Sequence, residues 1–197
     1  MAVTVHELRI TLEDIKPRIW RTFVVPSGIP LAALHRVIQN VMGWEDSHLH
    51  RFEIHGVGYE ALMPGTDQEA DTQDARKAVV GELVPSAGDG FVYQYDFGDN
   101  WVHSVEVINV RPPSAAVRYP ACTAGERACP PEDCGGVGGF EAVLDALAHP
   151  GRAESRELLV WLGPDYDPAS FNLANANRRL NSLRPRASPR RSQPGGR

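Results

Sequence analysis

The sequence predicts an α+β fold: a mostly antiparallel sheet covered by helices, in a single compact domain. Strand-like patterns lie on both sides of one amphipathic helical pattern, and three further helical patterns follow near the end. This order is typical of α+β proteins rather than of alternating parallel units. The 197 residues are 42% hydrophobic and 23% charged, which suits one soluble domain with its own core.

The first part of the chain predicts two strands and a helix. β-branched and other apolar residues dominate 3–12 and 19–25, and Pro17 between them favours a turn because proline fixes φ and cannot donate to a ladder. From Pro30 onward, apolar residues recur with the three, four and seven spacing of an amphipathic helix. Gly43 is a natural end for this helix.

The next segments are less regular. Residues 48–55 alternate as a strand, with His48, His50, Phe52 and Ile54 on one face. Residues 60–78 are polar and predict a long loop, and residues 79–84 predict a short strand.

A hairpin and three helices complete the predicted domain. Residues 91–97 and 101–110 alternate as strands, and residues 98–100 (Gly-Asp-Asn) favour a tight turn because they tolerate positive φ. The helical patterns cover 140–147, 158–162 and 173–180. We expect the domain to span 1–183 and residues 184–197, rich in arginine and proline, to form a disordered tail.

The segment 121–139 holds all three cysteines together with prolines, acids and glycines. Proline lacks a backbone donor and glycine costs backbone entropy, so we expect neither a helix interior nor a central strand here. We call residues 121–135 the Cys-rich loop. Such a loop holds a metal, shapes a site or joins two elements, and glycines 135–139 let it pass close to another segment.

Zinc binding is one interpretation of the cysteines. Cys122, Cys129 and Cys134 with His103 would make a tetrahedral site, and His48 is the alternative fourth ligand. The other interpretation is that the cysteines pack as small hydrophobic residues. A redox switch is disfavoured, because the nearby acids would raise a thiol pKa.

The hairpin and the Cys-rich loop together predict a binding pocket. Its candidate residues are aromatic or titratable, and they are Tyr95, Asp96, Asp99, Trp101, His103, Glu132 and Asp133. The competing interpretation is that Asp96 and Asp99 only cap the turn through Asx-type hydrogen bonds.

A metal-dependent hydrolase is a second functional class. His48, His50, His103, Asp96 and Asp99 could hold a metal that activates water. The chain has no Walker A sequence, no dinucleotide-binding glycine fingerprint, no H-E-x-x-H and no G-x-S-x-G motif. Sequence motifs therefore name no catalytic residue.

Charge and hydropathy limit the partners. No signal-like or membrane-spanning stretch is found, so we expect a cytoplasmic protein without membrane contact. Five of the 20 basic residues lie from Arg184 onward, so the first 183 residues carry 15 basic and 25 acidic side chains. An acidic body opposes DNA, so nucleic acid could bind only through the 184–197 tail, and the other interpretation is that this tail serves only solubility.

The chain resembles the Ri-plasmid ORF-3-like family, also labelled transposon passenger TnpR proteins. The resemblance covers roughly residues 3–183. Its motifs are Tyr95 to Gly98 with Asp99, Trp101 and His103; Cys122, Gly125 and Cys129 to Gly136; Trp161 to Gly163 with Asp167, Pro168 and Phe171; Asn177 to Leu180; and Ile19 to Arg21 with Gly43 and Trp44.

The resemblance implies a compact α+β fold and an association with plasmids and mobile elements, but no established activity. Resolvase chemistry does not fit, because Ser27 lies in a Pro-Ser-Gly-Ile-Pro loop with no helix-turn-helix after it. We therefore predict a binding or accessory module whose pocket takes a protein, a peptide or a small ligand. A metal-dependent hydrolase and a DNA-associated accessory protein remain the alternatives.

Overall fold

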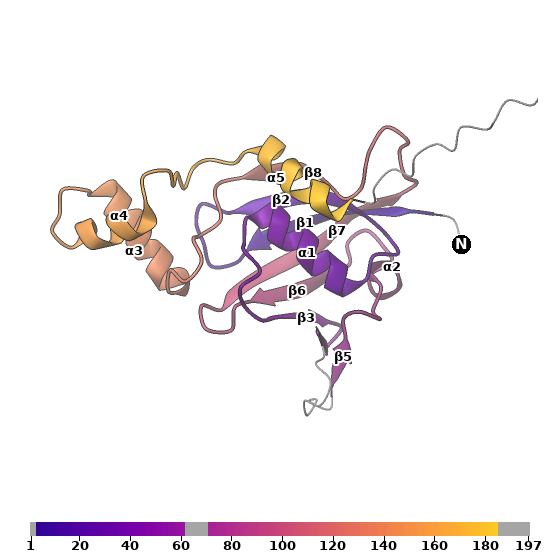
Figure 1. The fold of residues 1–197 in the computed structure, drawn as a ribbon. Helices are drawn as coiled ribbons and strands as arrows, with labels where there is room; N and C mark the ends of the chain where they lie inside the picture. The colour runs from indigo at the N-terminus through magenta and orange to yellow at the C-terminus, as the bar shows by residue number, and fades with distance from the viewer. Residues whose placement is uncertain (1–2, 62–70, 185–197) are drawn as a thin grey trace, which may run out of the picture.

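The computed structural model describes residues 3–61 and 71–184 (Figure 1). The strands are β1 (Val5–Leu12), β2 (Trp20–Pro26), β3 (His50–Ile54), β4 (Val57–Glu60), β5 (Thr72–Asp74), β6 (Gly90–Tyr95), β7 (Trp101–Arg111) and β8 (Ala121–Glu126). The helices are α1 (Leu31–Met42), α2 (Val80–Leu83), α3 (Gly136–Ala148), α4 (Ser155–Leu162) and α5 (Leu173–Leu180), followed by a 3-10 turn at Asn181–Leu183.

All eight strands form one sheet in the order β5-β4-β3-β6-β7-β1-β2-β8. Every pairing is antiparallel except β4 with β5, which confirms the predicted α+β class. None of the helices in the described ranges is both long and apolar enough to cross a lipid bilayer.

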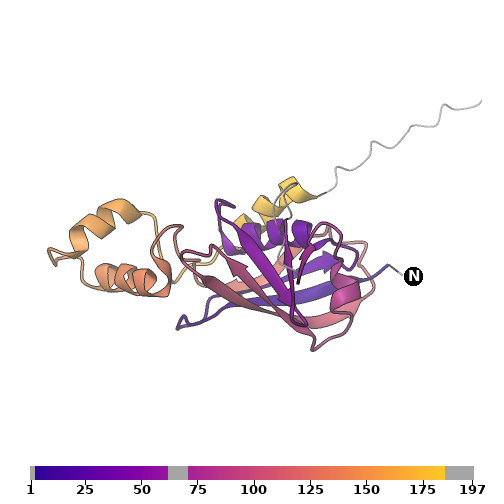
Figure 2. The same cartoon turned by 90° about the horizontal axis from the view of Figure 1, so that it is seen from below.

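One face of the sheet carries the core and α1 packs on it, with α5 beside α1 and β8 (Figures 1 and 2). The apolar stripe of α1 is buried, as its periodicity predicted. Residues at alternate positions of β1 and β7 are buried under it, whereas Ser104, Glu106 and Ile108 point to the other, exposed face. This alternation is typical of an antiparallel sheet with one solvated side.

The helical pair formed by α3 and α4 lies beside one end of the sheet rather than on its face, as Figures 1 and 2 both show. Phe140 and Val143 of α3 are buried, whereas Val160 and Trp161 of α4 are 78% and 50% exposed. The predicted cover of helices is thus supplied chiefly by α1 and α5.

Several predicted elements are confirmed and others need correction. The first two strands, the hairpin, α1 and the last three helices lie where the patterns placed them. Residues 79–84 do not form the predicted strand: Val79 makes a single bridge with Pro30, and α2 follows because Gly81 N–H donates to Ser27 O (2.8 Å). The conformation of residues 79–84 thus depends on a contact with a residue that is distant in sequence.

Three short strands, β4, β5 and β8, were not predicted. The first two lie at or next to a segment read as a long loop, of which residues 62–70 fall outside the described residues. The Cys-rich loop contains β8, which is an edge strand, in agreement with the exclusion of a central one. Residues 136–139 form the first turn of α3, so the glycine run begins a helix without lying in its interior.

Arg21 is a charged side chain in the core, only 1% exposed. Its guanidinium donates five hydrogen bonds, all to backbone carbonyls: Nε to Val41 (2.9 Å), Nη1 to Trp20 and Glu126 (2.7 and 2.8 Å), and Nη2 to Arg127 and Met42 (2.7 and 3.4 Å). Val41 and Met42 end α1, whose C-terminus attracts positive charge. The guanidinium also lies over the Phe171 ring at 4.2 Å.

Two histidines that were candidate ligands lie in or beside the core. His103 is fully buried, and its Nδ1–H donates to Tyr93 O (3.2 Å). The His50 ring stacks on the buried His35 ring, with centroids 3.4 Å apart. Burial lowers the pKa of both His103 and His50 to about 4, and for His50 the neighbouring His35 adds to this effect.

Replacing Arg21 tests its five-donor role. Lysine keeps the charge but has three donors, so Arg21→Lys leaves buried carbonyls without partners, and we expect the free energy of unfolding to fall by about 3 kcal/mol. Urea denaturation measures this change. The exposed Arg18→Lys is the control and should change stability by less than about 0.5 kcal/mol. Equal stability of the two variants would show that only the charge of Arg21 matters.

The low pKa values of His103 and His50 predict acid sensitivity. Their folded-state pKa of about 4 lies below the unfolded value of 6.5, so the unfolded chain binds protons first. The free energy of unfolding therefore has its full value above pH 6.5. It falls as the pH drops towards 4, and the loss due to His103 reaches about 3 kcal/mol.

Urea denaturation between pH 7 and pH 4 measures this loss. His103→Gln should flatten the profile, whereas the exposed His149→Gln should leave its shape unchanged. An unaltered profile in His103→Gln would exclude His103 as its source.

Candidate functional site

The Cys-rich loop packs against the tip of the hairpin formed by β6 and β7. Gly135 N–H donates to Asp99 Oδ2 (3.1 Å), and Tyr95 OH donates to Glu132 Oε1 (3.0 Å). A Cβ on Gly136 would lie 2.6 Å from Asp99 O, and its φ is +68°, so only glycine suits this position. The predicted close passage of the glycine run is thus found at Gly136.

Local backbone conformation fixes the two acids at the centre of this junction. Asp96 and Asp133 both have a φ of 55°, a left-handed conformation that aspartate tolerates better than most residues. Asp96 Oδ1 accepts from the backbone N–H of Gly98 (2.9 Å) and Asp99 (3.3 Å). This is the predicted Asx-type cap, but it uses one carboxylate oxygen and leaves Oδ2 available.

That second oxygen belongs to a cluster from three distant segments. His48, Asp96 and Asp133 each offer one metal-ligand atom, and these atoms all lie within 4.8 Å of one another. His48 Nε2 is 3.1 Å from Asp133 Oδ1, 3.6 Å from Asp96 Oδ2 and 3.8 Å from Glu132 Oε2. We call His48, Asp96, Glu132 and Asp133 the junction cluster.

Two atoms of the junction cluster are buried without a hydrogen-bond partner in the described part of the chain: His48 Nε2 and Glu132 Oε2. Glu132 Oε1, by contrast, accepts from Glu45 N–H (2.7 Å) and from Tyr95 OH. Buried polar atoms normally have partners, so unpaired atoms that face each other need an explanation. The side chains of Asp96 and Glu132 are 10% and 14% exposed, whereas that of Asp133 is 72% exposed. The cluster therefore opens to solvent on the Asp133 side.

Tyr95 and Ser47 position the Glu132 carboxylate of the junction cluster through hydrogen bonds. Tyr95 OH accepts from Ser47 N–H (3.0 Å) while it donates to Glu132. Burial, together with the nearby Glu132 carboxylate, raises the pKa of Tyr95 above its usual value, so the phenol keeps the proton that it donates. The His48 ring meets the Tyr95 ring edge-on, with centroids 5.9 Å apart.

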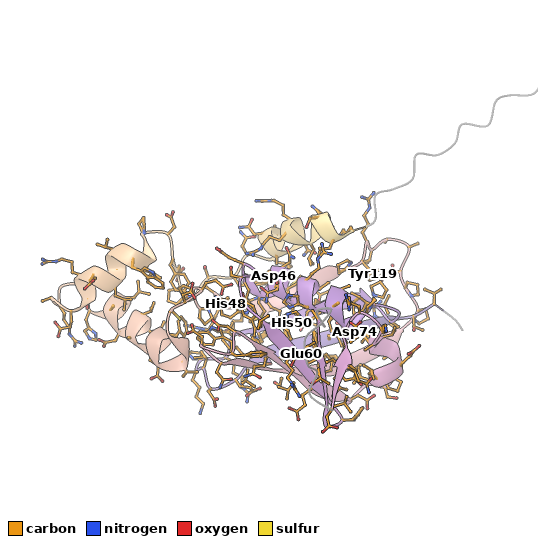
Figure 3. The ribbon with its side chains drawn as sticks, turned by 60° about the horizontal axis from the view of Figure 1, so that its bottom comes forward. Asp46, His48, His50, Glu60, Asp74 and Tyr119 are labelled. Atoms are coloured by element: carbon orange, nitrogen blue, oxygen red, sulfur yellow. The ribbon has the colours of Figure 1, made fainter. Side chains whose placement is uncertain are left out.

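Other candidate ligands do not join the cluster. Trp101 and His103 are buried in the core, and Asp99 binds Gly135 instead. His50 stacks on His35 at the start of β3, whereas His48 precedes the strand; Figure 3 labels both histidines together with Asp46. Of the five ligands expected for a hydrolase, the structure brings together His48 and Asp96.

The three cysteines have different surroundings. Cys122 Sγ lies 3.5 Å from the carbonyl oxygens of Thr22 and Ala124, and Cys134 Sγ lies 3.9 Å from Gly136 O. Within the described residues, the sulfurs and His103 do not form a group of metal-ligand atoms like that of the junction cluster. Burial raises the pKa of Cys122 to about 11 and of Cys134 to about 12, and it raises that of Cys129 further. Protonated thiols suit the interpretation of the cysteines as packing residues.

A cavity of about 410 Å³ opens on the other side of the Cys-rich loop. The end of α1, residues 128–132 and α5 line it, with Arg21 and Tyr166 in its walls. Arg179 lies at its edge and donates to the carbonyls of Gly43 (3.2 Å) and Trp44 (2.7 Å). The hairpin does not line this cavity, so the loop contacts the hairpin on one side and the cavity on the other. Glu132 belongs to both.

Sequence reasoning missed the partners that position the cluster. The backbone N–H groups of Glu45 and Ser47 carry no signal in the sequence, although the polar turn after Trp44 marks where they lie. Arg184, the first residue of the predicted tail, instead contacts the domain. Arg184 donates to Pro120 O (3.0 Å) and Asn177 Oδ1 (3.2 Å), and residues 185–197 lie outside the described residues.

One known protein is similar to this chain in sequence, and one solved structure is similar in sequence and fold. The chain is 36% identical over 185 residues to the uncharacterized protein y4hQ of Sinorhizobium fredii (strain NBRC 101917 / NGR234), covering 93% of this chain and 94% of that protein. It also resembles the crystal structure of the protein of unknown function MM3350 from Methanosarcina mazei Go1. That match has a TM-score of 0.80 and 36% identity, and it covers 89% of this chain and 97% of the other. The pattern that defines the plasmid pRiA4b ORF-3-like proteins matches residues 4–175, and the chain therefore belongs to this family.

Proposed function

We propose that this protein is a binding module that holds a divalent cation between the hairpin tip and the Cys-rich loop. His48 Nε2, Asp96 Oδ2 and Asp133 Oδ1 are the ligands, and Glu132 Oε2 is the nearest further donor. One observation carries the proposal: a buried imidazole nitrogen without a hydrogen-bond partner faces three carboxylates. A cation would bind this nitrogen together with the carboxylates that face it.

Electrostatics support a positive ligand. The junction cluster gathers three carboxylates around one imidazole, and none of the three forms an ion pair with lysine or arginine within the described residues. Like charges at this separation repel, and the effect is strongest for the largely buried Asp96 and Glu132. A divalent cation converts this repulsion into attraction.

The donor types narrow the choice of cation. Imidazole nitrogen suits zinc and other transition metals, and carboxylate oxygen suits manganese and magnesium. One nitrogen with two or three oxygens therefore favours Zn²⁺ or Mn²⁺ over Ca²⁺, which takes six to eight oxygen ligands. The exposed side near Asp133 leaves room for water in the remaining positions.

The place of the cluster suggests what the cation does. Its ligands come from the loop before β3, the hairpin tip and the Cys-rich loop, so one ion joins three segments. Glu132 faces the cluster and also lines the cavity of about 410 Å³. Cation binding would order this wall of the cavity. The ligand of the binding module is then a small molecule or a peptide that occupies the cavity.

Titration of the purified protein with Mn²⁺, followed by the loss of the free-ion EPR signal, tests the site. We expect one ion per chain and at least a tenfold loss of affinity in Asp133→Asn and Asp96→Asn. Asparagine keeps the left-handed backbone at both positions and the Oδ1 acceptor of Asp96, so the fold persists. Mn²⁺ avoids the thiols, which favour softer metals.

Asp99→Asn is the matched control. It removes one charge from the same hairpin tip but lies outside the junction cluster, so the affinity should change less than threefold. No binding to the wild-type protein, or an equal loss in all three variants, would contradict the proposal.

Hydrogen exchange tests the coupling between the cation and the cavity wall. Adding Zn²⁺ or Mn²⁺ should slow amide exchange in residues 129–135 and 96–99, because one ion then restrains both segments. Residues 155–162 of α4 lie away from the cluster and serve as the internal reference. Equal slowing throughout the chain, or slowing that persists in Asp133→Asn, would place the ion elsewhere.

A further inference from the structure

A serine and a histidine form a hydrogen-bonded pair at the opposite end of the sheet from the junction cluster. Ser27 follows β2 in the turn before α1, and His6 lies in β1, paired with Val25. His6 Nδ1 is 2.8 Å from Ser27 Oγ. Residues at the start of β1 pair with the end of β7, so the full length of β7 separates this pair from the hairpin tip.

The surroundings of His6 fix its tautomer. Nε2 lies 3.0 Å from Val84 O, and a carbonyl oxygen can only accept, so Nε2 carries the proton. In the neutral ring Nδ1 is then an acceptor and receives the Ser27 O–H. This is the relation between a nucleophile and its general base, with a carbonyl in the orienting position. Burial lowers the pKa of His6, which favours the neutral ring that a base needs.

Two further groups can stabilise charge on the serine and its substrate. Thr4 Oγ1 lies 2.7 Å from Ser27 Oγ and, since the serine proton points to His6, the threonine hydroxyl donates to the serine oxygen. The turn is closed by Ile29 N–H donating to Pro26 O (3.0 Å), and the Gly28 N–H has no acceptor within the described residues. A free backbone N–H after the nucleophile is the usual position of an oxyanion donor.

Ser27 also lines a cavity of about 580 Å³. Its other walls include Val3, Ile29 and Val79, which present apolar side chains, and Gly28, which has open space where a Cβ would point. His6 is 1% exposed behind the serine, whereas Ser27 is partly accessible. A small apolar acyl group therefore has room next to the hydroxyl while the base stays shielded from water.

We propose that Ser27 is a nucleophile activated by His6, and that it transfers the acyl group of small apolar carboxylic esters. Ser27 Oγ attacks the ester carbonyl carbon and its proton moves to His6 Nδ1. The tetrahedral intermediate collapses, the bond to the leaving alcohol breaks, and the alcohol takes the proton from His6. Water then attacks the acyl–serine ester, with its proton again accepted by His6, which releases the carboxylic acid and restores the serine.

Labelling with a fluorophosphonate probe, read by intact mass and peptide mapping in the presence of EDTA, tests the nucleophile. The serine oxygen displaces fluoride from phosphorus, so we expect one adduct per chain, on Ser27. Ser27→Ala should abolish it, and the exposed Ser86→Ala should leave it unchanged. Absence of an adduct, or an adduct elsewhere, would overturn the proposal.

The role of the base needs its own readout. His6→Gln should slow both labelling and the EDTA-resistant hydrolysis of p-nitrophenyl butyrate at least tenfold, with circular dichroism showing that the fold is kept. Unchanged rates would mean that Ser27 is merely exposed.

If His6→Gln does not fold, a cysteine in place of Ser27 tests the same role of His6. Ser27→Cys should react with iodoacetamide at pH 7 at least ten times faster than Ser86→Cys, because His6 favours the thiolate. The three native thiols have raised pKa values, and peptide mapping separates them. Equal rates in the two variants would overturn the activation.

Discussion

The guanidinium of Arg21 joins three parts of the molecule in one wall of the cavity. Its five hydrogen bonds reach the end of α1, the start of β2 and the residues at which β8 passes into the rest of the Cys-rich loop. A buried charge is costly unless its donors are satisfied, and here all five N–H groups donate to backbone carbonyls. Gly125 makes this possible, since a Cβ there would lie 2.7 Å from Arg21 Cδ and from the Phe171 ring.

The path of the Cys-rich loop follows from this arrangement. Once Arg21 fixes residues 126 and 127, the chain passes beneath the end of α1, and Glu132 reaches the N–H of Glu45 and the hydroxyl of Tyr95. Asp133 then arrives beside His48 and Asp96. The junction cluster is thus positioned by neighbours that are not themselves ligands. Its geometry depends on the buried guanidinium of Arg21, which lies on the other side of the same loop.

Much of the fold could be predicted because its elements have strong local signals. The spacing of apolar residues predicts the buried stripe of α1 and the alternating burial in β6 and β7. The structure of residues 79–84 could not be predicted in this way, because their apolar run suits a strand and a helix equally. The hydrogen bond from Gly81 N–H to Ser27 O, which is distant in sequence, favours the helix. The candidate site was predicted in part. The acids at 96, 132 and 133 and His48 stood out by residue type. Which histidine joins the acids depends on how deeply each histidine is buried, and the sequence does not give this. His103 points into the core from a strand, whereas His48 lies on a turn at its margin.

The helical pair α3–α4 begins at Gly136, the residue that touches Asp99 at the hairpin tip. The pair is held at its other end as well, because the chain that returns from α4 to α5 contacts the same loop: Tyr166 OH donates to Cys129 O (2.9 Å) and Ala128 N–H donates to Pro168 O (3.2 Å). Both connections of the helical pair are thus tied to the Cys-rich loop, so a substitution that loosens the loop would loosen the two helices as well as the junction cluster.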